Sequence, residues 1–139
     1  MRPRPQDWPA RLAAYLARHA DTPFAWGVHD CATFAAGWLV VLGYPDLTAA
    51  FRPCYSGPLS AARLMRAGGG YETLVERALA SQSCPAVSPV LARRGDVVVL
   101  PLDARRRALA IVDGRNAVAL TRTGCVTRPT LDAVVAYHV

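Results

Sequence analysis

The segment FAWGVHDCATF, residues 24–34, contains the residues best suited to chemistry in this chain. An aromatic and glycine loop leads into Asp30 and Cys31, which are expected to open a helix. Unpaired N–H groups and the helix dipole favour an anion there, so the Cys31 thiol is expected to ionise and attack carbonyl carbons. The neighbouring negative charge of Asp30 opposes ionisation of the thiol. The alternative is that Cys31 is a small buried residue that packs behind an N-cap, and both interpretations stay open.

Two helices are predicted to position this segment. Residues 7–19 have helical spacing of their apolar side chains and form the first helix. Asp30 is a good N-cap for a second helix over about 31–42, which Gly43 ends. The expected buried stripe of the second helix consists of Phe34, Trp38, Val41 and Leu42.

The remaining chain changes from helical to strand periodicity. LSAARLMRAGG and YETLVERALASQ predict two short helices, and SCPAVSPVLARRG is a proline-bearing linker. Strands are then predicted at DVVVLPL, in the hairpin ALAIVDGRNAVAL, at GCVTRP and at AVVAYHV. The expected fold class is therefore α+β, as one domain over 1–139 with a helical part at about 7–82. Its antiparallel sheet of about four to five strands, at about 95–139, is expected to pack against the helix that begins at Cys31.

The order of these motifs resembles the NlpC-type cell-wall peptidases, a branch of the papain-like cysteine hydrolases. The matching pieces are Trp26-Gly27, Asp30-Cys31 with Phe34 behind it, Gly95-Asp96 followed by VVVL, and the strand ALAIVDG. The resemblance runs over about residues 8–138, with a helical insertion between 55 and 82. Within this family, the chain is similar to the short versions found among phage and prophage tail genes.

The resemblance implies that Cys31 is a nucleophile that cleaves amide bonds in the peptide stems of peptidoglycan through an acyl-enzyme. It also implies a histidine at the start of the strand after the Gly-Asp strand. That position is Ala108 in this sequence, so the expected base is missing. The third polar group has no clear match either, because the following strand offers only Asn116 and Thr121.

Other side chains are candidates for parts of such a site. His29 lies two residues before Cys31 and is one possible base, and His138 on the last predicted strand is another. His19 closes the first helix and is interpreted as structural. Trp26 is a candidate wall of a substrate groove, with Asp30 beside it, although a packed loop anchor is the more common role of such a tryptophan.

Composition restricts the partners and cofactors. All 16 basic residues are arginine and the formal net charge is +6, which favours an anionic partner. The run Arg105–Arg107 is expected to be a solvated loop, and the lack of aromatic residues among the arginines argues against nucleic acid. Four cysteines without paired spacing and three histidines predict no metal site, no cofactor and free thiols. No run is long enough for a membrane span, and MRPRPQDWP contains no secretory signal.

Two functions remain open on these grounds. The first is a cysteine peptidase or amidase, a hydrolase acting on peptidoglycan at a phage tail tip. The second is a catalytically degenerate structural or adaptor component of the tail assembly, with other tail proteins as partners. Both predict a protein made in the bacterial cytoplasm and located in the virion tail.

Overall fold

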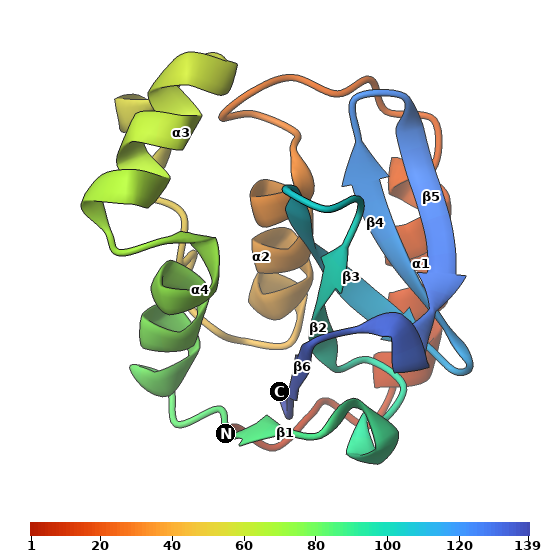
Figure 1. The fold of residues 1–139 in the computed structure, drawn as a ribbon. Coiled ribbons are helices and arrows are strands. Elements are labelled where there is room, and N and C mark those ends of the chain that lie inside the picture. Colours follow the sequence, from red (N-terminus) through yellow and green to blue (C-terminus); the bar gives the residue numbers. More distant parts are fainter.

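The fold, seen here in a computed structural model that describes residues 1–139, is α+β, with its helices preceding most of its sheet along the chain (Figure 1). The predicted helices are confirmed within one or two residues at most ends. They are α1 (Trp8–His19), α2 (Cys31–Val41), α3 (Pro58–Ala67) and α4 (Tyr71–Ala80). Helix α2 packs against strands of the sheet and against α1, and α3 and α4 lie on the opposite side of α2 (Figure 1).

A six-stranded antiparallel sheet forms the second layer, in the order β1-β6-β2-β3-β4-β5. Its strands are β1 (Ala86–Val87), β2 (Val97–Pro101), β3 (Arg107–Asp113), β4 (Asn116–Thr121), β5 (Gly124–Pro129) and β6 (Val135–Tyr137). The register of the central pair places Val98 opposite Ala110. All four residues Val97–Leu100 are buried, because β2 lies between β3 and β6 and both of its faces are covered.

The observed sheet differs in two respects from the predicted antiparallel sheet of about four to five strands. Strand β1 was missed because it has two residues, inside the proline-bearing linker, and a pair of residues shows no periodicity. Strand β6 does not continue the meander beyond β5 but crosses back to pair with β2. The crossing is held by two backbone bonds, from Thr130 N–H to the Arg115 carbonyl and from Val134 N–H to the Val99 carbonyl.

Helix α2 forms the centre of the core. The Asp30 side chain accepts from the Thr33 N–H while the Thr33 hydroxyl accepts from the Asp30 N–H, which is a complete capping box. Trp38 is fully buried and its indole N–H donates to the Gly95 carbonyl at 2.8 Å. Of the predicted stripe, Phe34, Trp38 and Leu42 are buried and Val41 is half-buried. Apolar residues occur all round this helix because it is covered on several sides.

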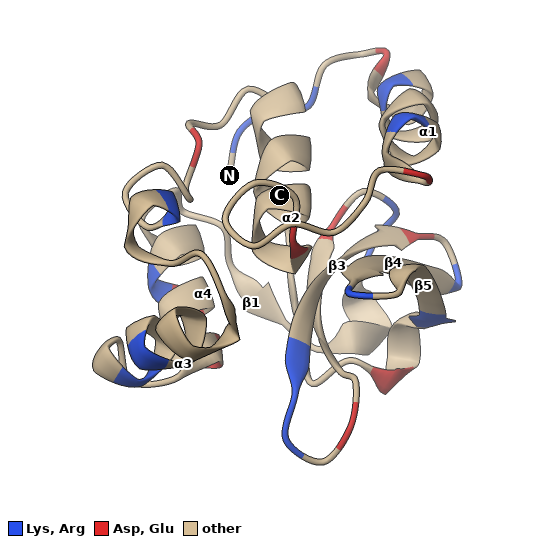
Figure 2. Cartoon of the chain, turned by 90° about the horizontal axis from the view of Figure 1, so that it is seen from above, with Lys and Arg blue, Asp and Glu red and all other residues tan.

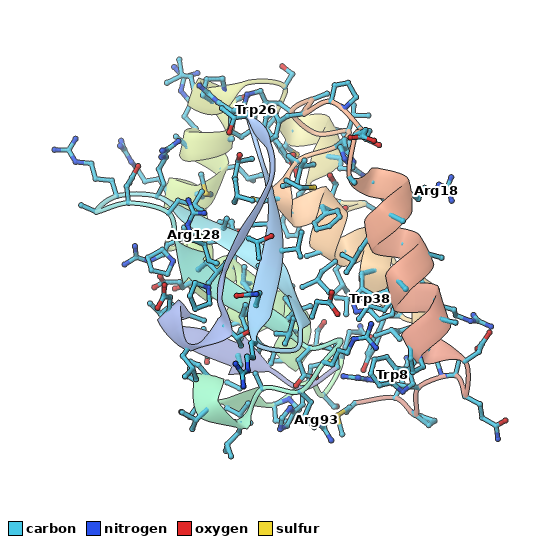
Figure 3. All side chains as sticks on the ribbon, turned by 90° about the vertical axis from the view of Figure 1, so that its right-hand side faces the viewer. Trp8, Arg18, Trp26, Trp38, Arg93 and Arg128 are labelled. Atoms are coloured by element: carbon cyan, nitrogen blue, oxygen red, sulfur yellow. The ribbon has the colours of Figure 1, made fainter.

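The Gly95-Asp96 pair joins the two ends of the chain. Gly95 has φ +88°, and a Cβ there would lie 2.8 Å from the Arg4 guanidinium. Asp96 is fully buried and its carboxylate accepts hydrogen bonds from Arg4 Nη2 at 2.6 Å and Val139 N–H at 3.2 Å. Both termini consequently lie at one end of the molecule, where Figure 3 also places Trp8. None of the helices has the length and apolar character needed to cross a membrane.

Candidate functional site

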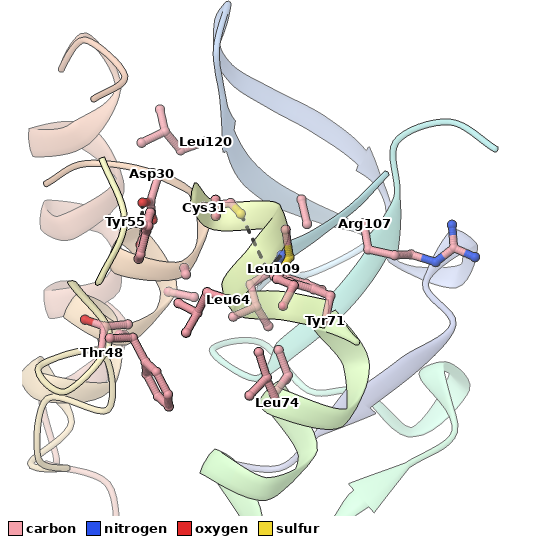
Figure 4. Close-up of a pocket in the computed structure, with 18 of the residues that line it drawn as sticks. Asp30, Cys31, Thr48, Tyr55, Leu64, Tyr71, Leu74, Arg107, Leu109 and Leu120 are labelled. Carbon is pink, nitrogen blue, oxygen red and sulfur yellow. Dashed lines mark hydrogen bonds between the residues drawn. The ribbon is translucent and has the colours of Figure 1, made fainter. Parts of the chain in front are cut away.

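Cys31 is the first residue of α2, as the sequence predicted, and its thiol faces a tyrosine. The sulfur lies 3.5 Å from the hydroxyl of Tyr71, the first residue of α4 (Figure 4). That hydroxyl also accepts a hydrogen bond from the Leu109 N–H at 2.8 Å. The tyrosine proton can therefore point toward the sulfur, since the N–H already occupies one of the oxygen's lone pairs.

The environment of Cys31 disfavours the thiolate. Burial raises the pKa of the Cys31 thiol; the hydrogen bond from Tyr71 opposes this rise, and the Asp30 charge adds to it. Burial also raises the pKa of the Tyr71 hydroxyl well above its ordinary value. Both groups are therefore protonated at neutral pH, so neither is ready to act as a nucleophile or a base.

The Asp30 carboxylate forms hydrogen bonds with the preceding loop, with Tyr55 and with the first turn of α2. One carboxylate oxygen accepts from the Thr33 N–H at 2.9 Å. The other accepts from the Gly27 N–H at 2.9 Å and from the Tyr55 hydroxyl at 2.6 Å. Burial and the bond to this carboxylate raise the pKa of Tyr55. The carboxylate is buried, so its three donors offset the loss of water, and its role is structural.

The structure places the His29 ring on the side of the loop that faces α1. Its ring stacks on that of His19, with centroids 5.1 Å apart, and meets Phe34 edge-on at 6.3 Å. Burial lowers the pKa of both histidines, so both rings are neutral at neutral pH. No hydrogen bond joins His29 to Cys31, whose side-chain partner is Tyr71.

His138 belongs to the cluster that joins the chain ends. The ring Nδ1 of His138 lies 2.7 Å from an Asp96 carboxylate oxygen. The backbone N–H of His138 donates to the Pro85 carbonyl. No hydrogen bond joins this imidazole to the Cys31 thiol. The face of β6 that carries it could not be predicted, because one residue of register reverses every side chain of a strand.

Position 108, where the resemblance implies a histidine, does lie beside the thiol. Ala108 is buried at 1% exposure and lines the same cavity as Cys31 and Leu109. Thr121 also lines this cavity, but its hydroxyl donates to the Gly124 carbonyl at 2.9 Å. Asn116 lies at the opposite, exposed end of β4. The site thus has a thiol and an alanine where the resemblance predicts a thiol and an imidazole.

A cavity of about 490 Å³ opens beside these residues (Figure 4). Its walls come from α2, from α3 and α4, and from strands β2, β3 and β4, and 23 of its 31 lining residues are hydrophobic. Trp26, the candidate groove wall, is among the lining residues, and its ring meets that of Tyr55 edge-on at 6.5 Å. Trp26 also carries the Arg122 guanidinium 5.2 Å above its ring. This volume lies within the range of about 300–1,000 Å³ that small-molecule sites occupy.

Arginines gather where the cavity meets solvent. The lining includes Arg105, Arg106 and Arg107, together with Arg122 from the β4–β5 turn. The loop between β2 and β3, which holds Arg105 and Arg106, projects beyond the sheet (Figure 2). Asp30 is the one acidic residue in the lining. The predicted solvated loop is therefore also the rim of an apolar cavity.

Sequence reasoning missed Tyr71 and Tyr55. Tyr71 follows the glycines 68–70, and Gly70, with φ +105°, directs the chain into α4. The segment was correctly predicted as a helix, but Tyr71 meets Cys31 across 40 residues of sequence. No periodic pattern reports a contact of that separation.

The other titratable and sulfur groups form no second site. Cys54, Cys84 and Cys125 are free thiols, exposed, buried and half-buried respectively. No three His, Cys, Asp or Glu side chains come together in a way that could hold a metal ion.

The fold and the site together define a class of protein. It is an α+β protein in which a cysteine thiol at a helix N-terminus faces an apolar cavity between helices and a six-stranded antiparallel sheet. The chain belongs to the family described as a domain of unknown function (DUF6950), whose model matches residues 3–139. No curated protein matches the chain.

The reactivity of the thiols tests this description of the site. We expect iodoacetamide to alkylate Cys31 several-fold more slowly than the exposed Cys54 near neutral pH, because alkylation requires the thiolate. We also expect the rate–pH profile of Cys31 to have its midpoint at a higher pH than that of a cysteine in a short unstructured peptide. Mass spectrometry of tryptic peptides across a pH series measures the profile and separates ionisation from accessibility. A Cys31 midpoint at or below that of the peptide would contradict the protonated thiol.

Proposed function

We propose that this protein is a catalytically degenerate NlpC-type domain that acts as a structural and binding component of a phage or prophage tail tip. The observation that carries the proposal is the environment of Cys31, which contains Tyr71 and Ala108 and no imidazole. The order of the sequence motifs supports the NlpC-type assignment, as does the position of residue 108 beside the thiol. The tail location rests on the resemblance to short versions among tail genes.

Amide hydrolysis by a thiol needs two things that the site lacks. The sulfur must be ionised, and a proton must be delivered to the departing amine, which is the role of an imidazolium in cysteine hydrolases. Burial raises the pKa values of both Cys31 and Tyr71. Neither group can supply the missing base at neutral pH, which supports a non-catalytic role.

The cavity walls also fit a peptide poorly. A bound peptide stem would place backbone N–H and C=O groups against mostly apolar side chains, and unpaired polar groups are costly to bury. The hydroxyls of Tyr55 and Tyr71 are already engaged, with Asp30 and with the Leu109 N–H respectively. The lining therefore supports a ligand other than the peptide stems of peptidoglycan.

Incubation with purified peptidoglycan tests the proposal. We expect the intact protein to release no more soluble peptide than the Cys31→Ser variant, because the thiol has no base. Chromatography of the soluble fraction measures this release. The Cys54→Ser variant is the matched control, since Cys54 is an exposed thiol outside the cavity lining. Release that requires Cys31 and not Cys54 would establish an active peptidase and reject the degenerate assignment.

A further inference from the structure

The cavity beside Cys31 is large, and its walls are mostly apolar. It measures about 490 Å³, a volume typical of sites that bind small molecules. Much of its wall is formed by leucines: Leu39, Leu64, Leu74, Leu79, Leu109 and Leu120. Ordered water needs two to four polar partners, which such walls do not supply, whereas apolar ligands bind in cavities of this kind.

The charge at the rim is unbalanced. Two of the four lining arginines are paired with acids outside the cavity: Arg106 with Asp103 at 2.6 Å and Arg107 with Glu72 at 2.9 Å. The side chains of the other two, Arg105 and Arg122, form no ion pair.

The acid within the lining, Asp30, forms no ion pair with these two arginines. Both Asp30 oxygens are engaged, one by the Thr33 N–H and the other by the Gly27 N–H and the Tyr55 hydroxyl. The apolar walls therefore suit a ligand with an aliphatic chain, and the unpaired arginines at the rim suit an anionic group at one end of that ligand.

We propose that the cavity binds a long-chain aliphatic carboxylate, with its alkyl chain along the leucine-rich walls and its carboxylate at the rim, beside one of the two unpaired arginines, Arg105 or Arg122. A guanidinium forms strong charge-assisted hydrogen bonds to a carboxylate, and it is fully charged at any physiological pH. An alkyl chain has no polar group to bury. This assignment holds whether or not the protein resides in a phage tail.

Titration of the full chain with dodecanoate, followed by calorimetry, tests the site. We expect saturable binding of one molecule, with each added methylene from octanoate to dodecanoate tightening the Kd about two- to fourfold. Dodecanol and dodecyltrimethylammonium should bind at least about tenfold more weakly, because neither carries a negative charge and so neither forms the charge-assisted bond that a carboxylate forms with a guanidinium. Added salt should weaken dodecanoate binding and leave dodecanol binding unchanged.

The rim is tested with the double variant Arg105→Ser/Arg122→Ser. We expect the Kd for dodecanoate to rise about tenfold and the Kd for dodecanol to stay the same. Arg128→Ser is the matched control, because Arg128 is an exposed arginine of β5 outside the cavity lining (Figure 3). Arg105 and Arg122 are both at the surface, so circular dichroism should show unchanged folding of the double variant.

The native thiols report where the ligand binds. Cys31 lines the cavity and Cys54 does not, so dodecanoate at ten times its Kd should slow alkylation of Cys31 about tenfold and leave Cys54 unchanged. Any of three results would overturn the proposal: no saturable binding, equal binding of the cationic amphiphile, or an unprotected Cys31. Tighter binding of dodecyl phosphate than of dodecanoate would likewise reject the carboxylate as the ligand's anionic group.

Discussion

Replacement of Asp96 by alanine should lower the free energy of unfolding by about 3–5 kcal/mol, as removal of one partner from a buried charged pair does elsewhere. The Asp96 side chain has no exposed surface and its carboxylate accepts from the side chain of Arg4 and from the N–H groups of Arg93 and Val139. His138 Nδ1 lies 2.7 Å from the same carboxylate. The substitution removes one hydrogen-bond or charge partner from each of these four groups, and it removes the carboxylate that links Arg4 and Val139 to the start of β2. Equilibrium denaturation in urea measures the change.

Asp113→Ala is the control for this prediction. Asp113 also pairs with an arginine, Arg94, at 2.8 Å, but both side chains are about two-fifths exposed. Surface ion pairs contribute about 0–1 kcal/mol, so the control should be close to the unsubstituted protein. Equal losses in the two variants would show that burial of Asp96 does not determine its contribution.

Trp38→Ala should lower the free energy of unfolding by a similar amount, about 3–5 kcal/mol, which is typical of large aromatic residues removed from cores. Trp38 is fully buried in the middle of α2, and its indole N–H donates to the Gly95 carbonyl. The indole links the central helix to the start of β2. Thermal and urea denaturation measure the loss.

Two further variants separate the contributions of Trp38. Trp38→Phe keeps an aromatic ring and removes the hydrogen bond. The loss of unfolding free energy due to that bond should be about 1 kcal/mol. Trp26→Ala is the matched tryptophan control, since Trp26 is half-buried at the cavity and should cost about 1 kcal/mol. A Trp26 loss as large as that of Trp38 would contradict the assignment of the core to α2 and the sheet.

The local elements were largely predictable from the sequence. The capping box at Asp30 joins residues only three positions apart, so it can be recognised in a short stretch of sequence. The hairpin of β3 and β4 was predictable for the same reason, because its alternating pattern flanks a short glycine-containing turn, which the structure places at Gly114-Arg115. The position of Cys31 at a helix start follows from the same capping signal.

The partners of the thiol were not predictable in this way. The nearest histidine in sequence, His29, stacks on His19, while Cys31 meets a tyrosine from a separate helix. Which side of a loop a ring occupies depends on the surface packed against it. For His29 that surface is α1, through its stack on His19.

The sequence by itself determined the α+β class, the four helices, every strand except β1, the thiol at a helix N-terminus and the alanine at position 108. Those features depend on patterns and contacts that span a few residues. Only the tertiary structure decided that Cys31 contacts Tyr71, that His138 contacts Asp96, and that a leucine-lined cavity has an arginine rim. These contacts join residues 40 and 42 positions apart, or residues from several elements at once. They form only when packing of the apolar faces brings distant segments together, and no local pattern records which segments will meet.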